Sequence, residues 1–274
     1  MNFLPLGLYA LAAGAYGVYF TRRSLPAGRI ATGTMVFGAL AHTFIIGMQT
    51  MQVGHIPFVG TTGAISAFVW LLALAYLYTE MTTDERSMGV FIAPLMVALQ
   101  LIPAISNQVA ERPTVLDSPW FAIHVSSLLL AYASLALACV IGITYVLLFK
   151  ELKGKNLGVF YSRLPSLQAL DVMNGRAVTF GWLFLTLGLA VGAIWLIQVQ
   201  PNTADPRIQA MSLFDAKIFI GFLCWVVYSF ELFARHKLAW GGKRAAWLSA
   251  IGFTIVLLNF VPVGYFVTES HNFY

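Results

Sequence analysis

Long apolar runs separated by short polar segments follow one another along the chain. A helix that crosses a bilayer needs about 20 apolar residues, and runs of roughly this length recur about eight times. They cover residues 3–20, 30–52, 63–80, 88–106, 119–149, 177–199, 212–235 and 246–268. The fifth run is longer than a bilayer requires, so we expect it to extend beyond the inner surface. The pattern predicts an all-α, polytopic integral membrane protein with about eight transmembrane helices, forming a single transmembrane helical domain over residues 1–274.

The charges between the spans predict their orientation. Cytoplasmic loops of membrane proteins carry an excess of Lys and Arg. Here the basic residues gather in alternate segments, at 22–29, 150–176 and 235–244, whereas the other segments carry few. Both termini are therefore expected outside. The arginines follow the first apolar run instead of preceding it, which is the reverse of the order in a signal peptide.

Three local features refine this prediction. The segment LPSLQALD, within the long polar stretch 150–176, predicts a short interfacial helix. Gly188 and Gly192 form a GxxxG pattern, which close packing between helices explains adequately. Pro94 and Pro103 are expected to kink the fourth span.

Composition agrees with a membrane protein. The chain is 59% hydrophobic and 10% charged, and topology alone accounts for its net charge of +5, so we expect no nucleic-acid partner. Cys139 and Cys224 both lie within apolar runs and form no CxxC pair. This placement favours two small buried side chains over a zinc or redox site.

Three histidines are the strongest candidates for chemistry. His124 follows the start of the fifth span by about five residues, which places it about 8 Å below the outer surface at about 1.5 Å per residue. His271 follows the last span and reaches the same surface from a distant part of the chain. Two imidazoles at one depth suit a single haem iron. His42 lies near the middle of the second span, where an ionisable residue is a functional candidate by default.

Structural explanations stay open for these and two further residues. His42 and His124 could each hydrogen-bond a backbone carbonyl, and His271 could be an ordinary residue of the chain end. Asp215 could cap a helix N-terminus, where a carboxylate is favoured. Glu231 precedes Arg235 by one helical turn, so we expect an ion pair between them.

Several stretches of the chain resemble the CcsA family of cytochrome c assembly proteins, also called ResC, and its HemX-like relatives. The stretches are AHTFIIGMQTMQVGHIPFVGTTGAISAFVW, AIHVSSLLLAYASLALACVIGITYVLL, LPSLQALDVMNGRAVTFGWLFLTLGLAVGAIW, FDAKIFIGFLCWVVYSF, HKLAWGGKRAAWLSAIGF and ESHNF. The resemblance runs over most of the chain, in the family's order and spacing. It implies a membrane protein that presents haem b at the outer face of the cell's inner (plasma) membrane, for attachment to the CxxCH motif of apocytochrome c.

The resemblance also implies roles for individual residues. His124 and His271 match the family's two external haem ligands. His42 matches a histidine of a transmembrane haem site whose second ligand comes from a partner subunit of the CcsB/ResB type. Trp195 and Asp215 match the two ends of the family's tryptophan-rich haem-binding stretch.

The chain departs from the family within that stretch. The family's pattern is roughly WGxYWxWDPKE, but no tryptophan lies between Trp195 and Asp215 in this sequence. Membership of a cytochrome c haem lyase is therefore left open. The departure motivates two alternative functions, a non-catalytic membrane subunit or scaffold that keeps the fold, and a HemX-like regulator of haem synthesis.

Overall fold

The computed structural model describes residues 2–58, 60–106, 118–155, 158–202, 209 and 216–258, and it is built from helices. The α-helices are α1 (Phe3–Arg22), α2 (Leu25–Val53), α3 (Thr61–Thr83), α4 (Gly89–Ile105), α5 (Pro119–Gly154), α6 (Val159–Arg163), α7 (Leu167–Val199), α9 (Ala216–Lys237) and α10 (Lys243–Leu258). A short 3₁₀ helix, η2 (Gln200–Asn202), continues α7. No strand occurs within the described ranges, so the all-α prediction is confirmed.

Each apolar run predicted from the sequence falls on one helix, as far as the structure describes the run. Six helices, α1, α2, α3, α5, α7 and α9, are long and apolar enough to cross a membrane. The fourth and eighth runs fall on the shorter helices α4, with 17 residues, and α10, which has 16 described residues. Residues 259–268 of the last predicted span lie outside the described residues. The chain is a multi-pass membrane protein.

One local prediction is wrong. The segment LPSLQALD does not form a separate interfacial helix, because α7 begins at Leu167 and continues without a break to Val199. The Ser166 side chain accepts a hydrogen bond from the Ala169 amide and caps the helix at 3.2 Å. Leu170 and Met173 are buried in the main core, so this first part of α7 is held by packing within the bundle.

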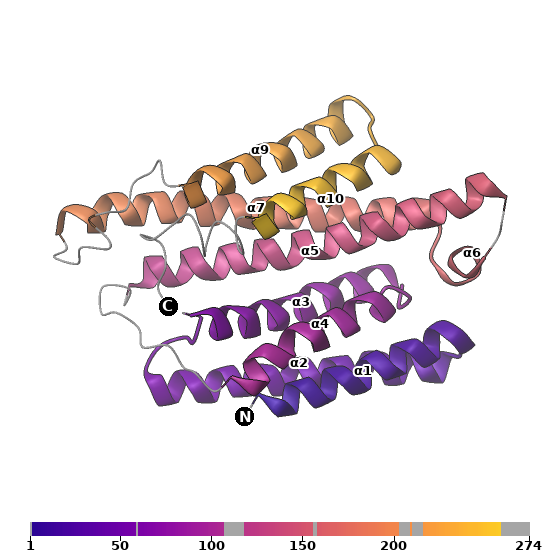
Figure 1. Ribbon diagram of the computed structural model, residues 1–274, viewed down its shortest axis with the longest axis horizontal. Coiled ribbons are helices and arrows are strands. Elements are labelled where there is room, and N and C mark those ends of the chain that lie inside the picture. The colour runs from indigo at the N-terminus through magenta and orange to yellow at the C-terminus, as the bar shows by residue number, and fades with distance from the viewer. Residues whose placement is uncertain are drawn as a thin grey trace.

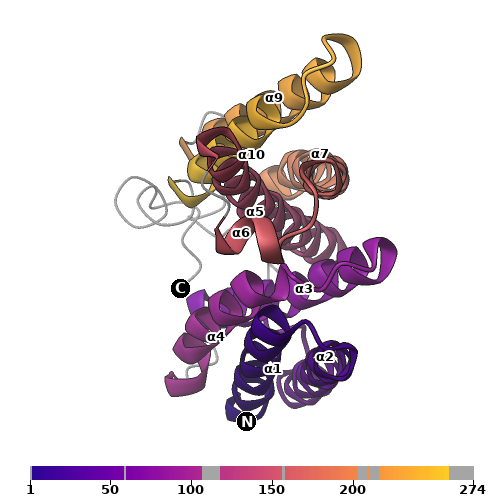
Figure 2. The ribbon, with the colours of Figure 1, turned by 90° about the vertical axis from the view of Figure 1, so that its right-hand side faces the viewer.

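The helices run along the long axis of the molecule and form two groups (Figure 1). One group contains α1 to α4, and the other contains α5, α7, α9 and α10. The two groups meet mainly where α3 packs against α5. Figure 2 shows the groups end-on, with α5 between α3, α7 and α10. Because α5 packs on helices of both groups, it is the central helix of the protein.

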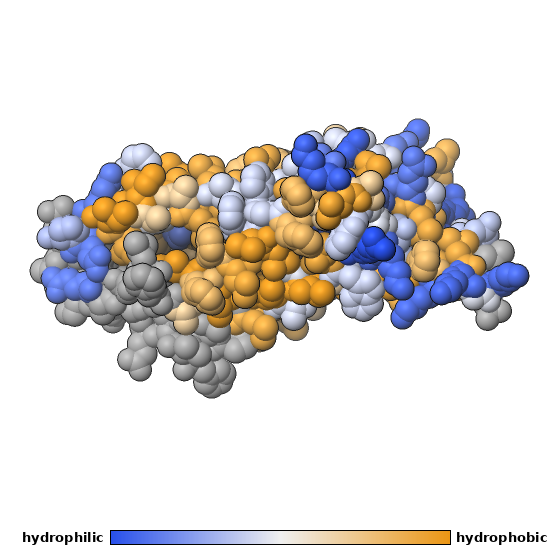
Figure 3. Space-filling view, turned by 90° about the horizontal axis from the view of Figure 1, so that it is seen from above, coloured by the Kyte–Doolittle hydropathy of each residue, from blue (hydrophilic) through white to orange (hydrophobic). Residues whose placement is uncertain are grey.

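The two ends of the molecule differ in charge. The connections between α1 and α2, α3 and α4, α5 and α7, and α9 and α10 lie at one end, here called the basic end, and the N-termini of α1 and α5 lie at the other, here called the His124 end. The basic residues at or near these connections include Arg22, Arg23, Arg86, Lys150, Lys153, Lys155, Arg163, Arg235, Lys237, Lys243 and Arg244. Figure 3 shows a hydrophobic middle and hydrophilic residues toward the ends, most densely at the basic end. This gathering is what the predicted orientation requires, and the orientation itself stays a prediction.

Candidate functional site

His124 lies near the start of α5, which Pro119 opens at the first helical position. Its Nδ1 atom is 2.7 Å from the backbone carbonyl oxygen of Gly188 on α7. A carbonyl oxygen only accepts hydrogen bonds, so Nδ1 carries the hydrogen and donates it. In the neutral ring, Nε2 then carries the lone pair. This is the tautomer in which Nε2 binds a metal.

The GxxxG pair of α7 lies directly against His124. A Cβ atom added at Gly192 would overlap the imidazole ring, approaching Nδ1 and Cε1 most closely and Cγ to 3.2 Å. A Cβ atom added at Gly188 would lie 2.6 Å from the Leu128 side chain, one turn further along α5. The interpretation of the two glycines as a close-packing feature is therefore confirmed, and the packing lies between two helices of this chain.

An aromatic pair lies at the same end of α5 and α7. Trp195, one turn beyond Gly192, is 5% exposed and packs against Phe121 with their ring centroids 5.3 Å apart. Together with Leu196 they form a small apolar cluster separate from the main core. The Trp195 indole nitrogen is buried and has no hydrogen-bond partner among the described residues. An unused buried donor is uncommon and calls for an explanation.

The other two residues predicted at this end, His271 and Asp215, lie outside the described residues. The described half of the site therefore consists of a histidine with its tautomer set, an aromatic pair and an indole donor that no described residue accepts from. This tautomer is the one in which a histidine can ligate a metal through Nε2, so the described half is compatible with a cofactor that carries a metal.

His42 lies in the other helix group and is enclosed by it. The side chain is 0% exposed, and its Nδ1 and Nε2 atoms are hydrogen-bonded to the Tyr9 hydroxyl at 3.1 Å and the Ser66 hydroxyl at 2.9 Å. The ring thus connects α1, α2 and α3 and uses both nitrogens to do so. The open structural explanation for His42 was a backbone carbonyl partner, whereas the structure provides two side-chain hydroxyls.

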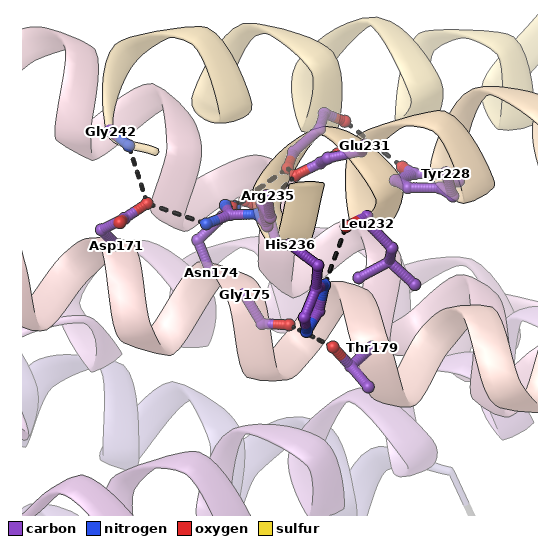
Figure 4. A network of polar contacts seen from close by, with 12 residues as sticks. Asp171, Asn174, Gly175, Thr179, Tyr228, Glu231, Leu232, Arg235, His236 and Gly242 are labelled. Carbon is purple, nitrogen blue, oxygen red and sulfur yellow. Dashed lines mark hydrogen bonds and ion pairs between the residues drawn. The ribbon is translucent and has the colours of Figure 1, made fainter. Parts of the chain in front are cut away.

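Sequence reasoning found only part of a polar cluster at the basic end, shown in Figure 4. The predicted pair is present, with Arg235 Nε 3.4 Å from Glu231 Oε1. The same guanidinium also donates to Asp171 Oδ1 on α7 at 2.9 Å and to the Asn174 side-chain oxygen. Ser249 on α10 donates to Glu231 at 2.8 Å. We call Asp171, Asn174, Glu231, Arg235 and Ser249 the Arg235 cluster.

The Arg235 cluster links four helices, α5, α7, α9 and α10, by hydrogen bonds. Asn174 donates to the carbonyl of Ala138 on α5 at 2.7 Å, and the backbone amide of Gly242 donates to Asp171 at 2.9 Å. Glu231 is 0% exposed, and its Oε2 atom has no hydrogen-bond partner among the described residues. Arg235 therefore provides most of the charge compensation for the buried Glu231 carboxylate.

A second buried carboxylate occupies a comparable place in the α1 to α4 group. Glu80, at the basic end of α3, is 2% exposed and accepts a hydrogen bond from the Tyr16 hydroxyl at 2.5 Å and another from Thr32. Arg86 lies 3.7 Å from the same carboxylate. We call Tyr16, Thr32, Glu80 and Arg86 the Glu80 cluster. The signal in the sequence was an acidic residue at the end of an apolar run, which is rare without a partner.

Comparison with known proteins gives a consistent result. The profile of the family described as "Cytochrome C assembly protein" matches residues 3–270. The protein named cytochrome c biogenesis protein CcsA of Guillardia theta is 24% identical over 264 residues, which cover 89% of this chain and 85% of that protein. Proteins of the same name are 26% identical in Chlorella vulgaris, over 82% of this chain and 80% of that protein, and 24% identical in Microcystis aeruginosa, over 99% and 95%. The matched residues include every described helix.

Proposed function

The chain belongs to the family of cytochrome c assembly proteins, and from that premise we propose that it binds haem b at the His124 end and presents it there for attachment to apocytochrome c. The His124 end then faces outward from the cell's inner (plasma) membrane. A membrane protein of the CcsB/ResB type is the proposed partner. When bound, haem supplies the vinyl groups that react with the thiols of apocytochrome c, and this chain supplies binding and orientation.

The observation that carries the proposal is the hydrogen bond from His124 Nδ1 to the Gly188 carbonyl oxygen. It leaves Nε2 as the basic nitrogen of a neutral imidazole, which is the usual axial ligand of haem iron. The Phe121 and Trp195 rings pack against each other at the same end of α5 and α7, and the buried Trp195 indole N–H has no hydrogen-bond partner among the described residues. These features support the placement of the haem at this end.

His271 is the proposed second axial ligand, and Asp215 the proposed acidic residue at the rim of the site. His42 takes no part in this proposal, because both of its ring nitrogens are hydrogen-bonded within the α1 to α4 group. Binding of iron to His42 would require the loss of the bond to Tyr9 or to Ser66.

The experiment is an absorption spectrum of the full-length protein purified from haem-replete cells. We expect a six-coordinate haem spectrum whose Soret and α bands weaken in His124→Ala and in His271→Ala. His55→Ala is the matched control, because His55 Nδ1 lies 3.2 Å from the carbonyl of its own neighbour Ile56 in the turn after α2. A wild-type protein without haem, or two variants with unchanged bands, would refute the proposal.

One observation favours a second candidate, a membrane subunit that keeps the fold without binding haem. No tryptophan lies between Trp195 and Asp215, where the family has a tryptophan-rich stretch. This candidate predicts stable association with other membrane proteins and no haem at any stage of purification. The same spectrum, recorded on the protein together with whatever associates with it, distinguishes the two functions.

A further inference from the structure

We infer that Gly192 and the carbonyl group of Gly188 act as a positioning device for His124, setting both the tautomer of the imidazole and the direction of its Nε2 atom. The part of this inference that concerns haem rests on the proposed function. The part that concerns the tautomer is a property of the protein without cofactor.

The first element of the device is the acceptor. The Gly188 carbonyl belongs to α7, where it is also the helical hydrogen-bond acceptor for the amide four residues later. A carbonyl oxygen has two lone pairs, so it can accept the helical hydrogen bond and the one from His124 Nδ1 at 2.7 Å. Because the acceptor is part of a helix backbone, its position is fixed. A ligating histidine whose other nitrogen donates to such a group is oriented and made more basic.

The second element is space. The Cβ atom of any larger residue at position 192 would occupy the place of the imidazole ring. Gly192 is four residues after Gly188 and therefore on the same face of α7. One turn of α7 thus provides the acceptor at its beginning and the gap at its end, so the ring fits in one orientation.

A purely packing role predicts something different. The atoms nearest to a Cβ added at Gly188 belong to Leu128, so a methyl group there would disturb the contact between α5 and α7 first at Leu128, one turn from the imidazole. Gly188→Ala keeps its backbone carbonyl and is therefore the packing control on the same face of the same helix. Gly33→Ala, on α2, is the control for a helical glycine with nothing within 4 Å of an added Cβ.

The test is solid-state NMR of full-length, cofactor-free protein in lipid, labelled with ¹⁵N-histidine and assigned by comparison with His124→Ala. We expect His124 to be protonated at Nδ1 and unprotonated at Nε2 in the wild type, in Gly33→Ala and in Gly188→Ala. In Gly192→Ala this preference is expected to disappear. Haem retention, followed by the Soret band during dilution, is expected to weaken about 10- to 100-fold in Gly192→Ala, the range for loss of a group that orients a ligand.

The outcomes separate the inference from the proposed function. A wild-type His124 protonated at Nε2 overturns the inference, and this measurement does not depend on whether Gly192→Ala folds. An unchanged tautomer in Gly192→Ala overturns it as well. So does unchanged haem retention in Gly192→Ala when His124→Ala loses haem. If His124→Ala instead keeps its haem, the proposed function fails, and the inference about the tautomer is judged on the NMR result alone.

Discussion

Replacement of Arg235 with alanine removes the only cation bound to a fully buried carboxylate in the Arg235 cluster. Glu231 is 0% exposed and receives its remaining hydrogen bond from Ser249 at 2.8 Å. The substitution also removes the hydrogen bond that Arg235 donates to Asp171. Asp171 then keeps the hydrogen bond from the backbone amide of Gly242. Removal of one partner of a buried ion pair costs about 3–5 kcal/mol, mostly because the other charge is left without compensation.

This free energy predicts a measurable change in thermal stability. At about 2–4 °C per kcal/mol for a chain of this size, the midpoint of unfolding in Arg235→Ala should fall by about 6–20 °C. The assay is thermal unfolding of the purified protein in detergent, followed by loss of its monodisperse gel-filtration peak. Lys237→Ala is the matched control, because Lys237 is an exposed cation at the end of the same helix. Its substitution should cost less than about 1 kcal/mol.

A second substitution tests the stated cause. In Arg235→Ala/Glu231→Gln the buried carboxylate becomes a neutral amide, so most of the lost stability should return. If the double variant is no more stable than Arg235→Ala, uncompensated charge is not the reason for the loss. If Arg235→Ala and Lys237→Ala unfold at the same temperature, the Arg235 cluster contributes nothing beyond a surface cation, and the reasoning is refuted.

Three further predictions concern other parts of the protein. Tyr16→Phe removes a donor to Glu80 and should destabilise the protein by about 1–3 kcal/mol in the same thermal assay, whereas Tyr78→Phe, on an exposed residue, should not. His42→Ala should lower thermal stability, since it leaves Tyr9 and Ser66 without their shared partner, yet leave the haem bands at the His124 end unchanged; loss of those bands would show that His42 binds haem after all. The orientation can be tested in a variant that lacks Cys139 and Cys224. A cysteine introduced there as Lys155→Cys should react with a membrane-impermeant thiol reagent only after the membrane is opened, whereas Gln52→Cys should react in intact cells. The reverse result would invert the predicted orientation.

The spans were predictable because bilayer thickness sets a length that can be counted along the sequence. The Glu231–Arg235 pair was predictable for the same kind of reason, since residues four apart lie on one helix face. Asp171 and Glu80 were not assigned partners because those partners come from other helices, and no sequence period relates them. The interfacial helix at LPSLQALD was a wrong prediction because its charged and polar residues resemble a surface segment, while the burial of Leu170 depends on packing that only the fold reveals.

The candidate site was likewise predictable from the sequence only in part. Counting residues placed His124 near one end of the bundle, and the described end of α5 agrees. The hydrogen bond to Gly188 and the gap at Gly192 depend on the relative rotation of α5 and α7, which hydrophobic runs do not specify. The assignments of His124, His271, His42, Trp195 and Asp215 to haem stay predictions.

The length of the central helix has a consequence for how the protein meets the aqueous phase. With 36 residues, α5 measures about 54 Å at about 1.5 Å per residue, and α7, with 33 residues, measures about 50 Å. A bilayer with its headgroups is about 40–45 Å thick. Because both helices are longer than this, we expect the corner made by the end of α5, by α6 and by the start of α7 to stand clear of the lipid as a small helical knob. An antibody fragment raised against this knob would recognise the native protein without detergent, and would report directly which compartment the knob occupies.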